Sequence, residues 1–135
     1  ELSPKEVLDI FQNEYVNRED TVKLMECHFK QIDGIQAELT ILVNGEKKVY
    51  HGQGNGRLDA ISNAIMKHFD IKFSLVTYEE HALQVGSDSQ ACAYVGLEVE
   101  GVNGIVWGAG IKSDIIDASA YALISALNRS NHMNK

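Results

Sequence analysis

Hydrophobic and polar residues alternate along two long stretches of the chain. Residues 35–43 place an apolar side chain at every second position, and residues 91–99 repeat the pattern. A period of two brings the apolar side chains to one face of an extended strand. Each stretch is therefore predicted to be a half-buried β-strand.

Two further strands are predicted from less regular patterns. A strand at 21–30 has apolar residues on both sides: Met25, Cys27 and Phe29 on one, Val22 and Leu24 on the other. Another strand begins at 71–75, and residues 78–83 either continue it or bend away from it.

Two glycine-containing turns connect these strands to others. Asn44-Gly45 is a strong hairpin signal, because both turn positions require a positive φ. It leads into a predicted strand at 47–53. The segment 101–104 predicts a second hairpin, which leads into a strand at 105–110.

Three segments have the residue spacing of amphipathic helices. The first, 3–16, begins with a capping box in which Ser3 caps the helix and Glu6 closes the box. The second ends near Phe69, and the third covers 115–128. The predicted buried stripe of the second helix consists of Leu58, Ile61, Ile65 and Phe69, with Ala60 and Ala64 allowing close packing.

The order strand-strand-strand-helix occurs twice. Leu-Asp-Ala at 58–60 recurs as Ile-Asp-Ala at 116–118. This duplication predicts an α+β fold of two βββα units related by a pseudo-twofold axis, each antiparallel sheet covered by one helix. We expect an N-terminal helix and linker at 1–20 that follow an upstream region. The main domain is expected at 21–135, with its units at 21–70 and 71–135.

Composition excludes several classes of protein. The 135 residues suit one domain, and the net charge of −7 argues against binding the phosphate backbone of nucleic acids. The sequence contains no apolar run long enough to cross a bilayer and no signal peptide. Cys27 and Cys92 lack metal-ligand spacing, and two lone thiols favour a reducing, cytoplasmic setting.

The sequence contains no familiar catalytic motif of the metalloprotease, nucleophile-elbow, Walker or Cys-x-x-Cys type. His81 follows Glu79 and Glu80 and could orient a carboxylate, although a structural role is favoured for this isolated histidine. We therefore predict no catalytic residue and no metal site in this chain.

The most distinctive stretch is 52–60, where three glycines end a predicted strand and open a predicted helix. Unpaired amides at a helix start attract anions, so Gly54, Asn55 and Gly56 are candidates to bind a carboxylate. A simple capped turn between strand and helix explains the same residues equally well. A second arrangement of this kind, Gly108-Ala109-Gly110 followed by Ser113, precedes the last helix.

Aspartates and one tyrosine complete the set of candidates. Asp59, Asp114 and Asp117 lie near helix starts, where a carboxylate interacts favourably with the helix dipole. For Asp59 a second role, receiving an ammonium group, stays open. Tyr78 is either a core aromatic or the wall of a pocket, because small side chains along the next strand leave space beside it.

Five motifs spread along the chain occur together in a known family. They are Gly-x-Gly-Asn-Gly-x-Leu-Asp-Ala at 52–60, Tyr-x-Glu-His-Ala-Leu at 78–83, Gly-x-Asp-x-Gln-Ala at 86–91, Val-Trp-Gly-x-Gly-Ile at 106–111 and Ala-Leu-Ile-Ser-Ala-Leu-Asn-Arg at 122–129. Together they resemble the C-terminal regulatory domain of 2-isopropylmalate synthase. The resemblance runs from about Asp9 to Arg129.

The resemblance implies a parent enzyme that condenses acetyl-CoA with 2-oxoisovalerate in leucine biosynthesis. Catalysis and a divalent metal would belong to an N-terminal TIM barrel, and this segment would carry no cofactor. The domain would form a cytoplasmic homodimer and bind L-leucine, which inhibits the distant active site. The positions that match the family's leucine pocket are Gly54, Asn55, Gly56, Leu58, Asp59, Leu75, Tyr78, Ala82, Ser89 and Ile115.

Other functions stay open at this stage. The related regulatory domain of citramalate synthase senses isoleucine, which differs from leucine only in methyl placement, a difference worth about 1–3 kcal/mol. A dimerisation module without a ligand is a second alternative. A small enzyme using His81 is a weaker one, because no nucleophile or metal set completes its site. The sequence also leaves open whether the site lies within one chain or between two.

Overall fold

This computed structural model describes residues 22–85 and 88–130, and nothing is described of the side chains of 83–88. The helix predicted at 3–16 and the first two residues of the Gly-x-Asp-x-Gln-Ala motif, 86–87, therefore lie outside the described residues. The elements are β1 (Val22–Gln31), β2 (Ile35–Val43), β3 (Glu46–Gly54), α2 (Arg57–Phe69), β4 (Phe73–Val85), β5 (Asp88–Val99), β6 (Ile105–Lys112) and α3 (Ile115–Arg129). They confirm the predicted α+β fold of two βββα units.

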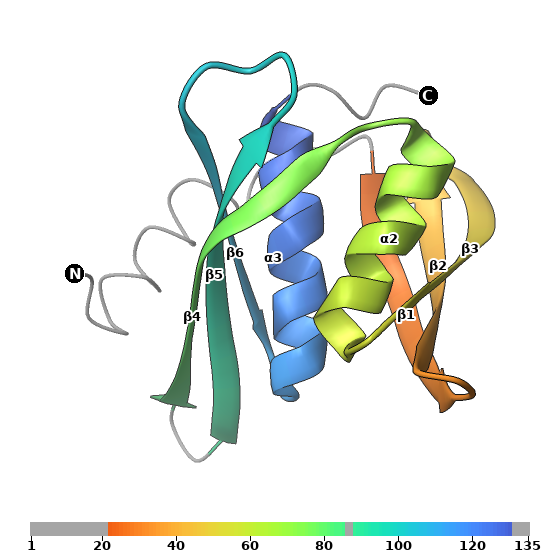
Figure 1. Cartoon of the computed structure of the whole chain (residues 1–135). Helices are drawn as coiled ribbons and strands as arrows, with labels where there is room; N and C mark the ends of the chain where they lie inside the picture. Colours follow the sequence, from red (N-terminus) through yellow and green to blue (C-terminus); the bar gives the residue numbers. More distant parts are fainter. Residues whose placement is uncertain (1–21, 86–87, 131–135) are drawn as a thin grey trace.

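The strands form two antiparallel sheets of three strands each. Sheet A has the order β1-β2-β3, and sheet B has the order β4-β5-β6. Helix α2 packs on sheet A and α3 packs on sheet B, and both helices lie between the two sheets (Figure 1). Helix α3 also contacts β1, so the last helix rests on the first described strand.

The turns and strand lengths agree closely with the hydrophobic pattern. Asn44 and Gly45 have φ angles of 52° and 84°, as the predicted hairpin between β2 and β3 requires. Residues 78–83 continue β4 rather than bend away, because β4 pairs with β5 along its whole length. Of the two alternatives predicted for residues 78–83, the structure therefore shows the continued strand.

The predicted sidedness of the first strand is wrong, and a β-bulge explains why. The register of β1 against β2 shifts between Leu24 and Glu26. The extra residue, Met25, is 54% exposed, whereas Leu24, Cys27 and Phe29 pack against the core. A bulge reverses the facing of every residue beyond it, so simple alternation failed here.

A second bulge lies at the corresponding place in β4. Its register against β5 shifts between Leu75 and Thr77, and the extra residue, Val76, is 49% exposed. The two units thus share the position of this irregularity as well as the order of their elements. Within the described residues no helix is long and apolar enough to span a membrane.

Candidate functional site

Helix α2 begins without a side-chain cap. Gly56 stands at the cap position in an extended conformation, with a φ of −139°, and makes no side-chain capping hydrogen bond. A methyl group added at Gly56 would meet no atom within 4 Å. No cap side chain therefore accepts from the amides of the first turn, which an anion site also requires.

The residues just before this helix form a compact local unit. Asp59 accepts a hydrogen bond from the Asn55 amide at 3.0 Å. A Cβ atom on Gly54 would lie 2.5 Å from the Asp59 carboxylate and 2.8 Å from the Ala60 amide nitrogen. Gly54 is thus required by close packing, and the Asn55 amide already has an acceptor. The first-turn amides of α2 are the donors that remain for a ligand.

The start of α3 differs, which corrects the expectation of a second anion site. Asp114 caps this helix by accepting from the amides of Ile116, at 2.8 Å, and Asp117, at 3.2 Å. Gly108 and Gly110 lie directly under α3, where an added Cβ would come 2.4 Å from its backbone. These glycines allow close packing of helix on sheet, and a carboxylate of the chain itself already occupies the α3 amides.

A cavity of about 390 Å³ lies where the end of β4, the beginning of β5 and the start of α3 meet. It brings together three of the predicted site residues, Ala82, Ser89 and Ile115. Its other lining residues are Glu80, His81, Gln90, Ala91 and Ser113. Small side chains therefore leave space here.

Tyr78 connects this region of β4 to α3. Its hydroxyl lies 2.7 Å from Glu80 Oε2 and 2.7 Å from Ser119 Oγ. Burial is the main cause that raises the pKa of Tyr78, and the Ser119 hydrogen bond acts in the opposite direction. The ring also packs against the main core, as do Leu58 and Ile115. Leu75, at the bulge of the same strand, is 41% exposed.

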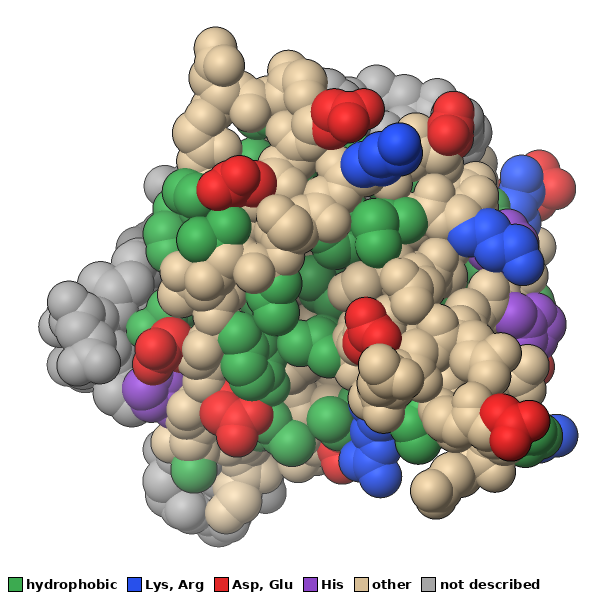
Figure 2. Space-filling model, viewed as in Figure 1, with side chains coloured by type: hydrophobic (Ala, Val, Ile, Leu, Met, Phe, Trp, Pro, Cys, Tyr) green, Lys and Arg blue, Asp and Glu red, His purple; other side chains and the backbone are tan. Residues whose placement is uncertain are grey.

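Most of the candidate residues fall into two groups at one end of the molecule, whereas Leu75 lies near the beginning of β4, next to Ser74 of the opposite end. Both helices start at the lower end in Figure 1, where β4 ends and β5 begins. In the same view, Figure 2 shows hydrophobic side chains gathered in a hollow between the strands of sheet B and α2. The start of α2 and the cavity beside α3 thus lie at the same end of this hollow. That they hold one ligand together stays a prediction.

Sequence reasoning missed two polar residues beside the cavity, Glu80 and Ser119. The spacing of Tyr78, Glu80 and Ala82 by two residues places them on one face of a strand, so Glu80 was accessible to prediction. No sequence signal points to Ser119, because it meets Tyr78 from a helix 41 residues further along the chain.

Among the described residues, no hydrogen bond is seen between His81 and a carboxylate. Its ring is stacked on that of Tyr94, with centroids 5.8 Å apart, and Nε2 is buried without a hydrogen-bond partner among the described residues. Tyr94 packs with Cys92 in a small cluster separate from the main core. The structural role favoured for this histidine agrees with that placement.

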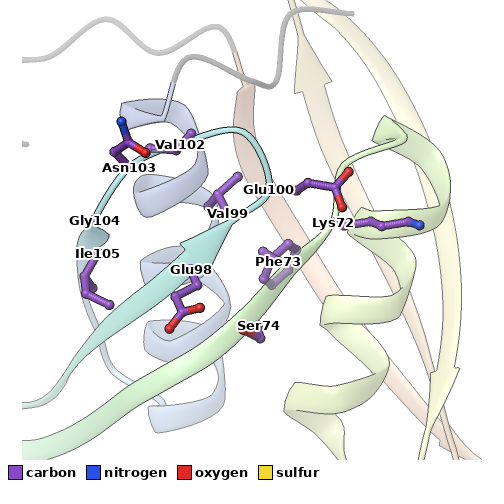
Figure 3. Close-up of a pocket in the computed structure, with 10 residues that line it drawn as sticks. All are labelled: Lys72, Phe73, Ser74, Glu98, Val99, Glu100, Val102, Asn103, Gly104 and Ile105. Carbon is purple, nitrogen blue, oxygen red and sulfur yellow. The ribbon is translucent and has the colours of Figure 1, made fainter.

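Another cavity, of about 560 Å³, lies at the opposite end of sheet B and contains none of the predicted residues. It is bordered by the connection from α2 to β4 and by the β5–β6 hairpin (Figure 3). In that view Lys72 and Glu100 extend to the same side, and Glu98 points away from both. They do not converge on one ligand group. Within 22–85 and 88–130, no group of three His, Cys, Asp or Glu side chains is placed to hold a metal ion.

The described residues form a duplicated α+β domain, in which α2 starts without a side-chain cap and a pocket of about 390 Å³ lies beside the start of α3. The family model described as LeuA allosteric (dimerisation) domain matches residues 1–131. The chain is 47% identical over 129 residues to 2-isopropylmalate synthase of Desulfitobacterium hafniense (strain Y51), covering 95% of the chain and 23% of that protein. It is 44% identical over 138 residues to 2-isopropylmalate synthase of Helicobacter hepaticus (strain ATCC 51449 / 3B1), covering 96% and 24%.

The chain belongs to the LeuA allosteric (dimerisation) domain family. It spans about a quarter of the length of the curated relatives that it matches.

Proposed function

We propose that this chain is the regulatory domain of a 2-isopropylmalate synthase, which binds L-leucine for feedback inhibition and contributes to a homodimer. The family match and the names of the relatives support this proposal. The condensation of acetyl-CoA with 2-oxoisovalerate, and its divalent metal, would belong to a catalytic TIM barrel in another part of the full-length protein. No catalysis is proposed for the 135 residues themselves.

One observation carries the proposal for a ligand: Ala82, Ser89 and Ile115, chosen by sequence resemblance, line a single cavity. Tyr78 closes the same region by its hydrogen bond to Ser119. Ala82 and Ser89 are exposed and Ile115 is half-buried, so a ligand can reach the space between them from solvent.

The chemistry of a branched-chain amino acid suits the rest of the region. Its carboxylate would accept from the open amides at the start of α2, next to Gly54, Asn55 and Gly56. Its side chain would be enclosed by apolar groups, and complete burial contributes roughly 1.5–3 kcal/mol. The enclosing side chains would be Leu58, Leu75, Tyr78 and Ile115.

Inhibition at a distance requires that leucine bind one global arrangement of the enzyme better than another. Two alternatives remain for the domain: an isoleucine sensor of the citramalate synthase type, and a dimerisation module that binds no amino acid.

Thermal denaturation of the chain with each of the twenty amino acids tests the proposal. Leucine should raise the melting temperature, because a ligand at a hundred times its dissociation constant stabilises the folded state by about 2.7 kcal/mol. Calorimetry then gives the affinity and the number of sites. Stabilisation by isoleucine alone would favour the citramalate synthase type. If no amino acid stabilises the chain and it is still a dimer, the result would favour a dimerisation module that binds no ligand.

A further inference from the structure

The two units of the duplication differ on the outer faces of their sheets, which point away from the helices. On sheet A one outer row of cross-strand neighbours is polar and exposed, and it consists of Lys30, Gln36 and Gln53. Counted from the bulge in each unit, the same places on sheet B hold His81, Cys92 and Ile111. The middle residue of this second row is completely buried, and its two neighbours are half-buried.

The adjacent row repeats the contrast. On sheet A it consists of three exposed polar residues, His28, Glu38 and His51. The same places on sheet B hold Glu79 and Tyr94, which are half-buried, and Ala109, which is buried. The outer face of sheet A is thus suited to water, whereas the matching part of sheet B is shielded from it. We call this part the Cys92 face, made of His81, Cys92, Tyr94, Ala109 and Ile111.

The described helices do not explain this shielding. Helix α3 packs on the inner side of sheet B, and α2 lies further inside the molecule (Figure 1). In the Cys92 face, His81 Nε2 is buried without a hydrogen-bond partner among the described residues, which is unfavourable unless a covering group bonds to it. The shielding is confined to one end, because Trp107, further along the same face, is 44% exposed. A short covering segment would explain all three observations.

The chain has another amphipathic segment of suitable size, the helix predicted at 3–16, which lies outside the described residues. Its 14 residues would be about 21 Å long as a helix. Val7, Leu8, Phe11 and Tyr15 have the spacing of one apolar stripe on such a helix. This docking stripe needs an apolar surface to pack on.

The connection to the described chain is long enough for the segment to reach the Cys92 face. Residues 17–21 lead to Val22, which is hydrogen-bonded to Asn128 near the end of α3. A linker of this length spans up to about 20 Å. Packed layers of a domain lie about 10 Å apart. The segment can therefore pass the end of α3 and lie on the outer side of sheet B.

We propose that residues 3–16 form a helix that packs its docking stripe on the Cys92 face of the same chain. Sheet B is then covered on both sides at this end, while sheet A keeps its polar outer face in water. This explains why only one unit of the duplication has apolar residues in these two rows. The inference goes beyond the proposed function and does not depend on a bound amino acid.

Disulfide trapping against the native thiol of Cys92 tests the contact on the 135-residue chain. Cys27→Ala removes the other thiol, and glutathione disulfide is the oxidant. Cysteine is then placed at one stripe position at a time, in the variants Val7→Cys, Leu8→Cys, Phe11→Cys and Tyr15→Cys. At least one should form an intrachain disulfide with Cys92, which peptide mass spectrometry identifies, because bridged Cβ atoms must lie about 3.8 Å apart. Asn13→Cys, on the opposite side of the predicted helix, is the matched control and should pair at least about tenfold more slowly.

The reactivity of Cys92 gives a second readout that needs no added cysteine. Phe11→Lys should raise the rate at which N-ethylmaleimide alkylates Cys92 by about tenfold or more, because local opening exposes the thiol. Asn13→Lys should leave that rate unchanged. The rate at Cys27, measured in the same digest, should stay constant in both variants, because this thiol belongs to sheet A.

The outcomes decide the docking directly. A disulfide between two chains would place the segment on a second copy and overturn docking within one chain. Equal trapping of Asn13→Cys and the stripe variants would overturn it as well, and so would no trapping without a selective acceleration at Cys92. If Phe11→Lys accelerates alkylation of both native thiols equally, the variant has unfolded, and the trapping result alone decides.

Discussion

At the scale of single residues, Asn128 joins the two ends of the described chain. Its side-chain nitrogen donates to the carbonyl of Val22 at 2.7 Å, and its side-chain oxygen accepts from the Val22 amide at 3.3 Å. Both residues are buried, and they are separated by 106 positions in the sequence. A side-chain amide thus gives the edge strand β1 the hydrogen bonds that a neighbouring strand would otherwise supply.

Replacing Asn128 by alanine should lower the free energy of unfolding by about 2–4 kcal/mol, because the amide and carbonyl of Val22 would be left buried without this partner. Urea denaturation measures the change. The exposed Asn103 offers a matched control, and Asn103→Ala should change stability by no more than about 0.5 kcal/mol. Equal effects of the two variants would contradict the bridging role of Asn128.

Cys27 should make stability depend on pH in the alkaline range. Burial, followed by the charges of Asp117 and Asp114, raises the pKa of this thiol from 9.0 to about 12. Between these values the unfolded chain loses a proton that the folded chain keeps. The free energy of unfolding should therefore fall as the pH rises from 9 towards 12, by at most about 1.4 kcal/mol per pH unit.

Urea denaturation at pH 8 and pH 10 (chosen to bracket the unfolded pKa) measures this slope. Cys27→Ala should be less stable at both values because of the lost packing, but its stability should fall less between them. Cys92, whose pKa burial raises to about 11, keeps part of the slope in that variant. Identical slopes for the wild type and Cys27→Ala would show that this thiol does not contribute.

At the scale of secondary-structure elements, the two helices of the duplication start in different ways. Helix α3 carries its own carboxylate at the cap, Asp114, whereas α2 has Gly56 there and no side-chain cap. An aspartate at the cap position stabilises a helix. With glycine at that position, α2 lacks this stabilisation. This difference makes α2 the helix that a ligand's carboxylate would approach.

Giving α2 the cap of α3 tests that role. The variant Gly56→Asp should be at least as stable as the wild type in urea, because no atom lies within 4 Å of the added Cβ. Its leucine affinity should fall by about tenfold or more, since the new carboxylate competes for the same amides and repels that of the ligand. Undiminished leucine binding by a Gly56→Asp chain that is capped and folded would contradict the site at α2.

A further element-scale prediction concerns the contact between β6 and α3. An alanine at Gly110 would bring its Cβ 2.4 Å from the carbonyl oxygen of Ala118 and 3.0 Å from the Ala122 amide nitrogen. Gly110→Ala should therefore cost about 1–3 kcal/mol of stability, as overpacking of a core does. Gly56→Ala is the control, and it should change stability by less than about 1 kcal/mol. A melting temperature for Gly110→Ala equal to that of the control would refute the close contact.

Periodicity predicted most of the elements because most strands bury only one face. Every second side chain of β2, and of β5 from 91 to 99, faces the main core. The Asn44-Gly45 turn fixed how β2 and β3 pair. Met25 was misplaced because a bulge adds a residue without changing composition. For Asp114 the sequence predicted an interaction with the helix dipole, and the structure adds that its carboxylate caps α3 through hydrogen bonds.

The candidate site was less predictable because it depends on contacts between distant segments. Resemblance to a family selected Ala82, Ser89 and Ile115, and the fold then placed them around one cavity. The hydrogen bond from Tyr78 to Ser119 could not be found from spacing, since it joins a strand to a helix across another hairpin. Its existence depends on how α3 packs on sheet B.

At the scale of the whole molecule, sheet B presents an apolar surface on the face that α3 does not cover. Trp107 is 44% exposed and Ile105 is 37% exposed. Both side chains lie over Gly96, where an added Cβ would come within 3.0 Å of either one. An exposed aromatic beside another apolar side chain is typical of a protein contact surface.

We expect Trp107 to take part in the proposed homodimer. Trp107→Lys should weaken dimerisation by about tenfold or more, measured by sedimentation over a range of protein concentrations. Met25→Lys places the same charge on an exposed apolar position of sheet A and should leave the dimer unchanged. A dimer that is weakened by Met25→Lys but not by Trp107→Lys would move the contact to sheet A.

The enclosure of α3 has a consequence for the chain as a folding unit. Sheet B covers one side of this helix and β1 the other, with Asn128 holding β1 in place. Neither βββα unit can therefore bury its own apolar surface when isolated. Cutting the connection between α2 and β4 should yield two peptides that are unstructured separately but reconstitute the native domain when mixed, because the covalent link contributes only the entropy of loop closure.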